Sequence, residues 1–237
     1  LLQIDTISVV ARSPYLVLFS RLGHYAPQWL EQALSAGKIF EYWAHEACFI
    51  PREDYALLRH RMLNPQAMGW KFSQNWFDEH RADIEALLEH ISENGPVRSA
   101  DFSADKKSAT GWWDWKPHKK HLETLFTAGK LMVSERRNFH RVYDLAEGVM
   151  PGWDDASQTL EQTVAEYQML RRSAQYLGIF KPEWLADYYR LKRVNTKALI
   201  TQLLAGGEIM PVEVAGLEGI YYVHQKQFSL LQQSLTS

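Results

Sequence analysis

The sequence predicts a mainly α-helical protein with small β-hairpins, of the α+β class. Two observations carry this prediction: a pattern of helix, glycine and hairpin that occurs three times, and the order of three helices before the hairpin in the second and third copies. With 46% hydrophobic, 13% aromatic and 23% charged residues, the chain has the composition of a globular protein. Its 237 residues suffice to bury one large core or several small ones.

The repeated pattern is centred on Gly37, Gly129 and Gly207. Each glycine follows two apolar residues, seven and three positions earlier, and precedes an apolar residue two positions later. Positions four apart share a helix face, and a glycine beyond the last turn can adopt the left-handed conformation that ends a helix. The apolar residues, copy by copy, are Leu30, Leu34 and Ile39; Leu122, Phe126 and Leu131; Ile200, Leu204 and Ile209.

After each glycine come two segments with the composition of strands. They are residues 39–43 and 47–50, 131–134 and 139–143, and 209–214 and 220–223. One helix followed by glycine and a strand occurs in many folds, but three copies favour related domains. The glycines lie 92 and 78 residues apart, which suits domains of winged-helix size rather than a solenoid.

The second copy is the most complete. An amphipathic helix carries Ile84, Leu87 and Ile91, Ser99 is the expected N-cap of a short second helix, and a third helix runs from near Pro117 to Gly129. This order is that of a winged helix-turn-helix domain. The third copy repeats it, with helices over 159–177 and 182–189 and a last one that Asn195 caps.

We therefore expect three tandem winged helix-turn-helix domains, at residues 1–80, 81–152 and 153–237. The linkers fall near residues 64–65 and 150–152, where proline interrupts the pattern. The first domain is expected to lack its earlier helices, since the chain starts at Leu1 without an initiator Met or a helix-start signal. The third is expected to be incomplete at its C-terminal end.

Charge is distributed unevenly. The whole chain carries −2, whereas residues 96–145 carry +4 and the remainder −6. The basic residues fall on the third helix and on the wing, where a winged helix meets phosphates, although charges of this kind also form solvated faces. The DNA-contact residues predicted here are Lys116, Lys119, Lys120, Arg136, Arg137 and Arg141. The cluster of Trp112, Trp113 and Trp115 could stack on bases, but such clusters more often pack in a core.

Cysteine use and hydropathy exclude several classes. Cys48 stands alone, so no intramolecular disulfide forms, and a reducing cytoplasm fits better than secretion. No Cys or His group has zinc-ligand spacing, and we expect neither a metal nor a cofactor. No apolar run reaches the length of a membrane span, since Arg12 interrupts the most apolar stretch.

The first residues carry the possible chemistry. A β-branched run follows Gln3-Ile4-Asp5, so we expect a strand with Gln3 and Asp5 on one face. A Gln amide can hold a water, and an Asp carboxylate can orient it, accept its proton or stabilise a nearby cation. Dipeptide spacing alone is weak evidence, because this pattern is far more often an ordinary surface strand.

Two N-terminal segments add context. Residues 2–7 read Leu-Gln-Ile-Asp-Thr-Ile, and residues 12–23 read Arg-Ser-Pro-Tyr-Leu-Val-Leu-Phe-Ser-Arg-Leu-Gly. Together with residues 42–47, 129–143, 170–174 and 207–212, they resemble the tandem winged-helix DNA glycosylases of the YcaQ/AlkZ type. The resemblance covers essentially the whole chain and is most specific in the first two segments.

The resemblance implies three winged-helix domains around a positively lined concave surface. It implies removal of N7-alkylated guanine from double-stranded DNA and unhooking of alkyl interstrand crosslinks. The catalytic motif of that family, Gln-apolar-Gln or Gln-apolar-Asp, falls on Gln3-Ile4-Asp5 and places the chain in the Asp-bearing branch. This gives Asp5 the task of activating water or stabilising an oxocarbenium-like sugar, with Gln3 positioning the water.

Three further residues are candidates for the same surface. His45 and Glu46 could line it, or be structural in their hairpin, and Arg12 could contact a phosphate or pair with a nearby acid. We expect a monomeric enzyme in the cytoplasm, associated with the nucleoid, because no dimerisation helix is evident. A non-catalytic winged-helix regulator and a protein-interaction scaffold are the alternatives.

Overall fold

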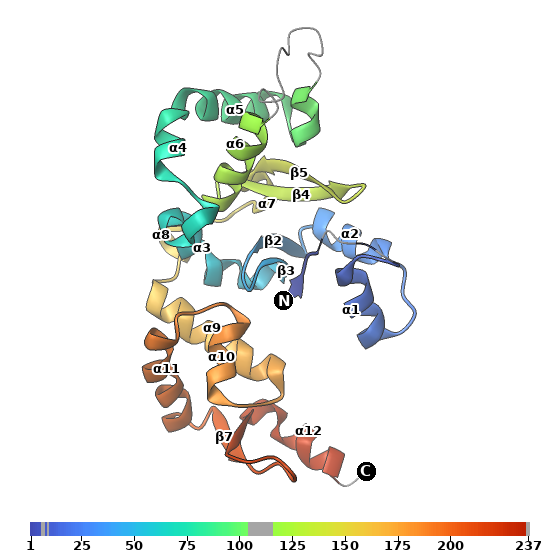
Figure 1. Ribbon diagram of the computed structural model, residues 1–237, viewed down its shortest axis with the longest axis vertical. Coiled ribbons are helices and arrows are strands. Elements are labelled where there is room, and N and C mark those ends of the chain that lie inside the picture. Colours follow the sequence, from blue (N-terminus) through green and yellow to red (C-terminus); the bar gives the residue numbers. More distant parts are fainter. Residues whose placement is uncertain (6–7, 9, 104–115, 236–237) are drawn as a thin grey trace. The chain divides into compact units, whose positions relative to one another are not determined.

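A computed structural model of the chain describes residues 1–5, 8, 10–103 and 116–235, apart from some side chains at the edges of these ranges. The chain forms two compact units, Leu1–Thr159 and Leu160–Ser237. Figure 1 shows that helices are the main component of each unit and that each unit also contains small antiparallel sheets. The expected α+β class with small hairpins is confirmed.

Unit 1 begins with a small three-stranded sheet in the order β1-β3-β2. Its pairing is antiparallel, with Gln3 opposite Cys48. We call this part of unit 1 the first module and the part that begins at residue 81 the second module. In the first module, one α-helix precedes the helix that ends at Gly37. The expectation that the first module lacks its earlier helices therefore does not hold for this helix. The elements are β1 (Leu2–Gln3), α1 (Ser13–Leu22), α2 (Gln28–Ser35), β2 (Ile39–Trp43) and β3 (Ala47–Pro51), followed by α3 (Tyr55–Leu63) and α4 (Gln74–Glu79).

The second part of unit 1 repeats this order. Val97 bridges to Tyr143 at the position that β1 has in the first module, just before a short 3-10 helix. The predicted short second helix is this 3-10 helix, Ser99–Ser103. The elements are α5 (Arg81–Asn94), α6 (Lys116–Thr127), β4 (Leu131–Arg137), β5 (His140–Leu145), α7 (Ala146–Val149) and α8 (Asp155–Gln158). Trp112, Trp113 and Trp115 lie outside the described residues.

Unit 2 shows the order once more, with a sheet β6-β8-β7. Asn195 lies inside α11 and Lys192 takes the N-cap position, so the predicted cap is three residues late. Glu208, which follows the glycine turn, accepts a hydrogen bond from Tyr167 of the long helix (2.7 Å) and pairs with Arg171. The elements are α9 (Gln162–Leu177), β6 (Ile179–Phe180), α10 (Pro182–Tyr188), α11 (Arg193–Ala205), β7 (Ile209–Val212), β8 (Tyr221–His224) and α12 (Gln225–Leu235).

The three glycines end their helices in the same way. Gly37, Gly129 and Gly207 have φ values of 62°, 60° and 66°. In each case the glycine N–H donates to the carbonyl three residues earlier, and the next N–H donates to the carbonyl five residues before it. These two bonds define a Schellman motif, which satisfies helix-end carbonyls and turns the chain directly into a strand. The predicted pattern of helix, glycine and hairpin is confirmed at all three sites.

The first two modules share one core. The hydroxyl of Tyr42, on β2, donates to the carbonyl of Thr127 at the end of α6 (2.6 Å). The ring of Phe126 lies 5.6 Å from that of Tyr42 and 6.1 Å from that of Tyr143. In Figure 1 the hairpin of β4 and β5 lies beside α2, and β4 packs against that helix. Unit 1 therefore contains both of the domains predicted at 1–80 and 81–152. The division of these residues into two domains stays a prediction.

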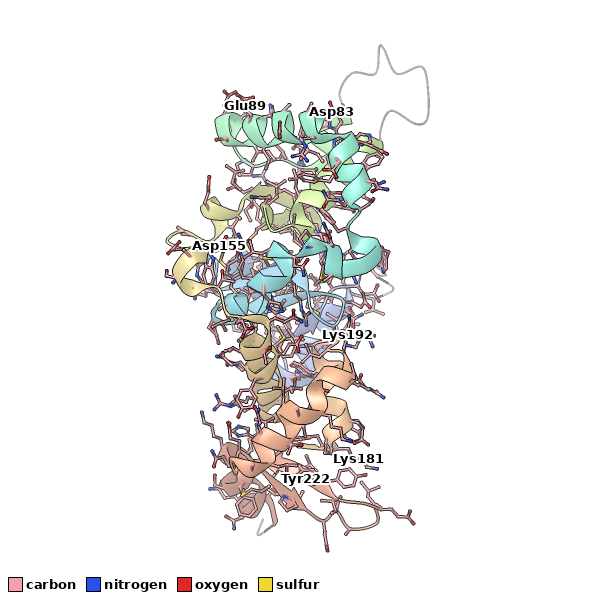
Figure 2. All side chains as sticks on the ribbon, turned by 90° about the vertical axis from the view of Figure 1, so that its left-hand side faces the viewer. Asp83, Glu89, Asp155, Lys181, Lys192 and Tyr222 are labelled. Atoms are coloured by element: carbon pink, nitrogen blue, oxygen red, sulfur yellow. The ribbon has the colours of Figure 1, made fainter. Side chains whose placement is uncertain are left out.

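The boundary between the units falls after Thr159, seven residues later than the predicted boundary. Asp155, labelled in Figure 2, receives hydrogen bonds from Arg59 of α3 at 2.6 and 2.7 Å. Trp153 packs edge-on against Tyr55 with ring centroids 4.7 Å apart. These contacts hold α8 in unit 1, and the arginine lowers the pKa of Asp155 to about 2.

A first prediction concerns Gly129. An added Cβ there would lie 2.6 Å from the Cβ of Met62, whereas one at Gly37 would meet the end of the Arg52 side chain at 3.2 Å and the Val149 carbonyl oxygen only at 4.0 Å. Gly37→Ala should cost about 1–2 kcal/mol, the usual cost of a left-handed alanine. Gly129→Ala should cost about 3 kcal/mol or more, because overpacking adds to it. Urea unfolding followed by tryptophan fluorescence checks this, and equal losses would contradict the packing argument.

Candidate functional site

The Gln3-Ile4-Asp5 segment is attached to the first sheet by its backbone. Gln3 pairs with Cys48, and the Ile4 N–H donates to the carbonyl of Ala47 (2.8 Å). The side chain of Gln3 is exposed and that of Asp5 is half-buried. The strand is shorter than predicted, since β1 ends at Gln3, and residues 6, 7 and 9 lie outside the described residues.

A cavity of about 370 Å³ borders this segment. Ile4 and Ala47 form its wall on the first module, while residues 98–100, α6 and the β4–β5 hairpin of the second module form the rest. Gln3 and Asp5 do not line it, as expected when side chains alternate along an extended chain. Basic side chains predominate among the charged lining residues: Arg98, Lys119, Arg136 and Arg141, with Glu123 as the acidic one.

Arg136 and Arg141 face a carboxylate inside the protein. They stand opposite each other on β4 and β5, a like-charged pair that is unfavourable by itself. The fully buried Glu41 of β2 accepts hydrogen bonds from both, at 2.8 Å from Arg136 Nη2 and 2.6 Å from Arg141 Nε. Burial lowers the pKa of Arg141, but Glu41 and Tyr143, which attract and hydrogen-bond its guanidinium, together raise the pKa above its usual value.

The predicted phosphate contacts of these two arginines therefore need correction. Their guanidinium groups are directed at Glu41, because a buried carboxylate must be neutralised. Glu41 lies about a hundred residues before its partners, so no local sequence pattern pairs it with them. The buried ion triad of Glu41, Arg136 and Arg141 joins the hairpin of the second module to the sheet of the first.

Arg12 is also engaged within the protein. Its guanidinium carbon lies 4.0 Å from the ring centroid of Phe139, at the tip of the β4–β5 hairpin, and that of Arg136 lies 4.4 Å from the same ring. Asn138 and Phe139 form a two-residue turn with φ values of 51° and 67°. A bulky residue there costs about 1–2 kcal/mol, which cation–π contacts of about 0.5–2 kcal/mol each offset.

Three of the other predicted contact residues, Lys119, Lys120 and Arg137, lie at the surface. Lys119 on α6 is well exposed, 3.9 Å from Glu123, and Arg137 on β4 is exposed beside Glu135. Lys120 places its ammonium 3.4 Å from the ring centroid of Trp76. Lys116 begins α6, but its side chain lies outside the described residues.

His45 and Glu46 occupy the turn between β2 and β3. The Glu46 carbonyl accepts a hydrogen bond from the Ala44 N–H (2.9 Å), and its carboxylate lies 4.0 Å from Lys71. Neither residue lines the cavity, although the next residue, Ala47, does. The structure thus places them beside the motif strand but not in the cavity.

In the described ranges, no group of three or more His, Cys, Asp or Glu side chains is arranged to hold a metal ion. Helices with the length and apolarity of a membrane span are likewise not found among the described residues.

Comparisons with known proteins agree with this arrangement. The chain is similar in structure to Streptomyces sahachiroi DNA glycosylase AlkZ, with a TM-score of 0.59, over 92% of this chain and 61% of that one. The sequences are 14% identical, so the likeness concerns the fold, and the chain spans about three fifths of that protein's length. A family model described as DNA glycosylase AlkZ-like matches residues 1–233. The chain belongs to the AlkZ-like DNA glycosylase family.

Proposed function

We propose that this protein is a monofunctional DNA glycosylase that removes N7-alkylguanine from double-stranded DNA and unhooks alkyl interstrand crosslinks. Family membership supports the reaction class. The observation that carries the proposal is the position of Gln3 and Asp5 on either side of Ile4, which borders a cavity lined in part by arginine and lysine. We expect a monomer that acts on nucleoid DNA in the cytoplasm.

The proposed reaction breaks the bond between C1′ of the sugar and N9 of the alkylated guanine. N7 alkylation gives the base a positive charge, so the electron pair of the breaking bond neutralises it, and departure needs no strong general acid. Positive charge develops on the sugar instead. A preorganised carboxylate stabilises such charge, which is the role proposed for Asp5.

Water then bonds to C1′ from the open side of the sugar. In this scheme the carboxylate of Asp5 accepts a proton from the water, and the amide of Gln3 holds the water in place. The products are the free alkylated base and an abasic site. The chemistry requires neither a metal nor a cofactor.

Release of the free base tests the proposal. The purified protein is incubated with duplexes that contain N7-methylguanine, a nitrogen-mustard crosslink or no damage, and binding to each duplex is measured in parallel. We expect base release from the first two duplexes only. Binding without release from any damaged duplex would overturn the proposal and favour a non-catalytic regulator.

A second prediction concerns DNA affinity. Lys119→Ala and Arg137→Ala should each weaken binding to any duplex and lower the slope of log K against log salt concentration by about 1, because each removes one phosphate contact. Arg81→Ala is the matched control, since Arg81 is an equally exposed arginine beside an acid but lies on α5. Unchanged salt slopes in the first two variants would show that these side chains of α6 and the β4–β5 hairpin do not contact DNA phosphates.

A further inference from the structure

The most exposed tryptophan that the structure describes lies beside the hairpin that holds the Gln3-Ile4-Asp5 segment. It is Trp70, and 85% of its surface is accessible. We infer that the indole of Trp70 stacks on a nucleobase of the bound DNA at the damaged nucleotide, where the stacking of bases is interrupted. The inference rests on the proposed function, because an enzyme that acts on a base within a duplex opens the stack at that base.

A tight turn presents Trp70 at the surface. The residue belongs to a 3-10 segment, η2 (Pro65–Lys71), which connects α3 to α4 and has a kink at Gly69 with φ 61° and ψ −131°. The N–H of Phe72 donates to the carbonyl of Gly69 (3.1 Å) and closes the turn. The positive φ favours glycine here, since an added Cβ would meet nothing within 4 Å. The backbone of η2 therefore directs the chain so that the indole stands in solvent.

Lys71 connects Trp70 to the first sheet. Its ammonium lies 5.1 Å from the ring centroid of Trp70 and 5.1 Å from that of Trp43, on β2. The carboxylate of Glu46, in the turn between β2 and β3, lies 4.0 Å from the same ammonium. The side chain of Lys71 is 17% exposed, so it is held between the two rings and this turn.

The same end of the hairpin holds the Gln3-Ile4-Asp5 segment. Trp43 pairs with Ala47 on β3, and the carbonyl of Ala47 accepts the hydrogen bond from the Ile4 N–H (2.8 Å). Contacts between described residues thus lead from the indole of Trp70 to the segment that carries the proposed chemistry. A base stacked on this indole would lie beside that segment.

The surroundings suit a nucleobase. Segment η2 packs against α6, on which Lys119 is exposed, and the negative charge of Glu46 faces the ammonium of Lys71. Proteins hold unstacked bases on aromatic side chains beside cations that follow the backbone, and every base has a face on which a ring can stack. Because the indole carries no charge, it adds affinity only where a base is accessible. Trp70 should therefore favour an opened duplex over an intact one.

The experiment compares affinity for an intact duplex with affinity for a duplex that carries a tetrahydrofuran abasic analogue at the target position. The parent should prefer the second duplex, and Trp70→Ala should lose about 10-fold of that preference, as expected for one stacked base. The affinity of Trp70→Ala for the intact duplex and its salt slope should stay parental, because an indole makes no ionic contact with phosphate. Trp70→Phe should keep most of the preference.

Trp29→Ala is the matched control. Trp29 lies on α2, is 59% exposed, and has its ring 6.2 Å from that of Tyr25. This variant should bind both duplexes like the parent. Stacking also quenches indole fluorescence, so the quenching of tryptophan emission by the abasic duplex should be weaker in Trp70→Ala than in the parent and in Trp29→Ala.

A parent without preference for the abasic duplex, or a parental preference in Trp70→Ala, would overturn the inference. So would an equal loss of affinity for both duplexes, or a change of oligomeric state in Trp70→Ala by sedimentation, which would identify Trp70 as a protein contact. None of these measurements depends on turnover. If the parent releases no base, the proposed function fails, and the binding comparison still decides whether Trp70 stacks on a base.

Discussion

Replacing Asp5 with Asn should slow release of N7-methylguanine by about 100-fold or more while leaving DNA binding in place. The substitution keeps the size of the side chain but removes its negative charge and its capacity to accept a proton. Proton transfer and charge stabilisation by a positioned group each contribute about 100-fold or more to rates. The loss should appear in the rate at saturating enzyme, because the carboxylate acts mainly in the transition state.

Single-turnover release from a methylated duplex measures this effect, with affinity for the same duplex measured by fluorescence anisotropy. Asp83→Asn is the control, since Asp83 is an exposed acid on α5, labelled in Figure 2. Gln3→Ala should give a smaller loss, as a positioned water can still reach the sugar. Release by Asp5→Asn at the parental rate would exclude the proposed role of the carboxylate.

Replacing Glu41 with Gln should destabilise unit 1 by about 3–5 kcal/mol, because it leaves two largely buried arginines without their counter-charge. For a unit of this size, such a loss corresponds to a fall of about 10 °C in Tm. Chemical unfolding followed by tryptophan fluorescence and thermal unfolding by circular dichroism measure the effect.

The control is Glu135→Gln, which removes one acid from an exposed pair with Arg137. Exposed pairs contribute at most about 1 kcal/mol, so this variant should unfold close to the parent. If Glu41→Gln also unfolds like the parent, the triad does not hold the two modules together.

The repeated helix ends were predictable from sequence because their cause is local. A glycine at the left-handed position, apolar residues one helix face apart and an apolar residue that begins the strand all lie within ten positions. Gly37, Gly129 and Gly207 accordingly end their helices as expected. Helix starts were less predictable: Asn195 has the right chemistry for a cap, but α11 begins two residues before it.

The role of Arg136 and Arg141 was not predictable from their surroundings. Basic residues on a hairpin look the same whether they face phosphates or a buried carboxylate, and Glu41 stands about a hundred residues earlier. Its own segment carried a signal, since Glu41 interrupts the aromatic residues of β2 and is fully buried there. A charged residue in a buried strand requires a partner, but the sequence does not say which one.

The turn at Phe139 was likewise not predictable from the sequence alone. A hairpin turn of two residues favours Asn followed by Gly, and the sequence has Asn138 followed by Phe139. The departure from the preferred residue marks a position where tertiary contacts decide. The contacts with Arg12 and Arg136 become visible only once the two modules are folded together.

The most direct test of the central claim uses a mimic of the reacting sugar. In a duplex that carries a cationic pyrrolidine in place of the target nucleotide, the positive charge stands where the oxocarbenium-like charge would develop. The parent should bind this duplex about 100-fold more tightly than an uncharged abasic analogue, and Asp5→Asn should lose that preference. Equal affinity of the parent for the two duplexes, or an undiminished preference in Asp5→Asn, would contradict the assignment of Asp5.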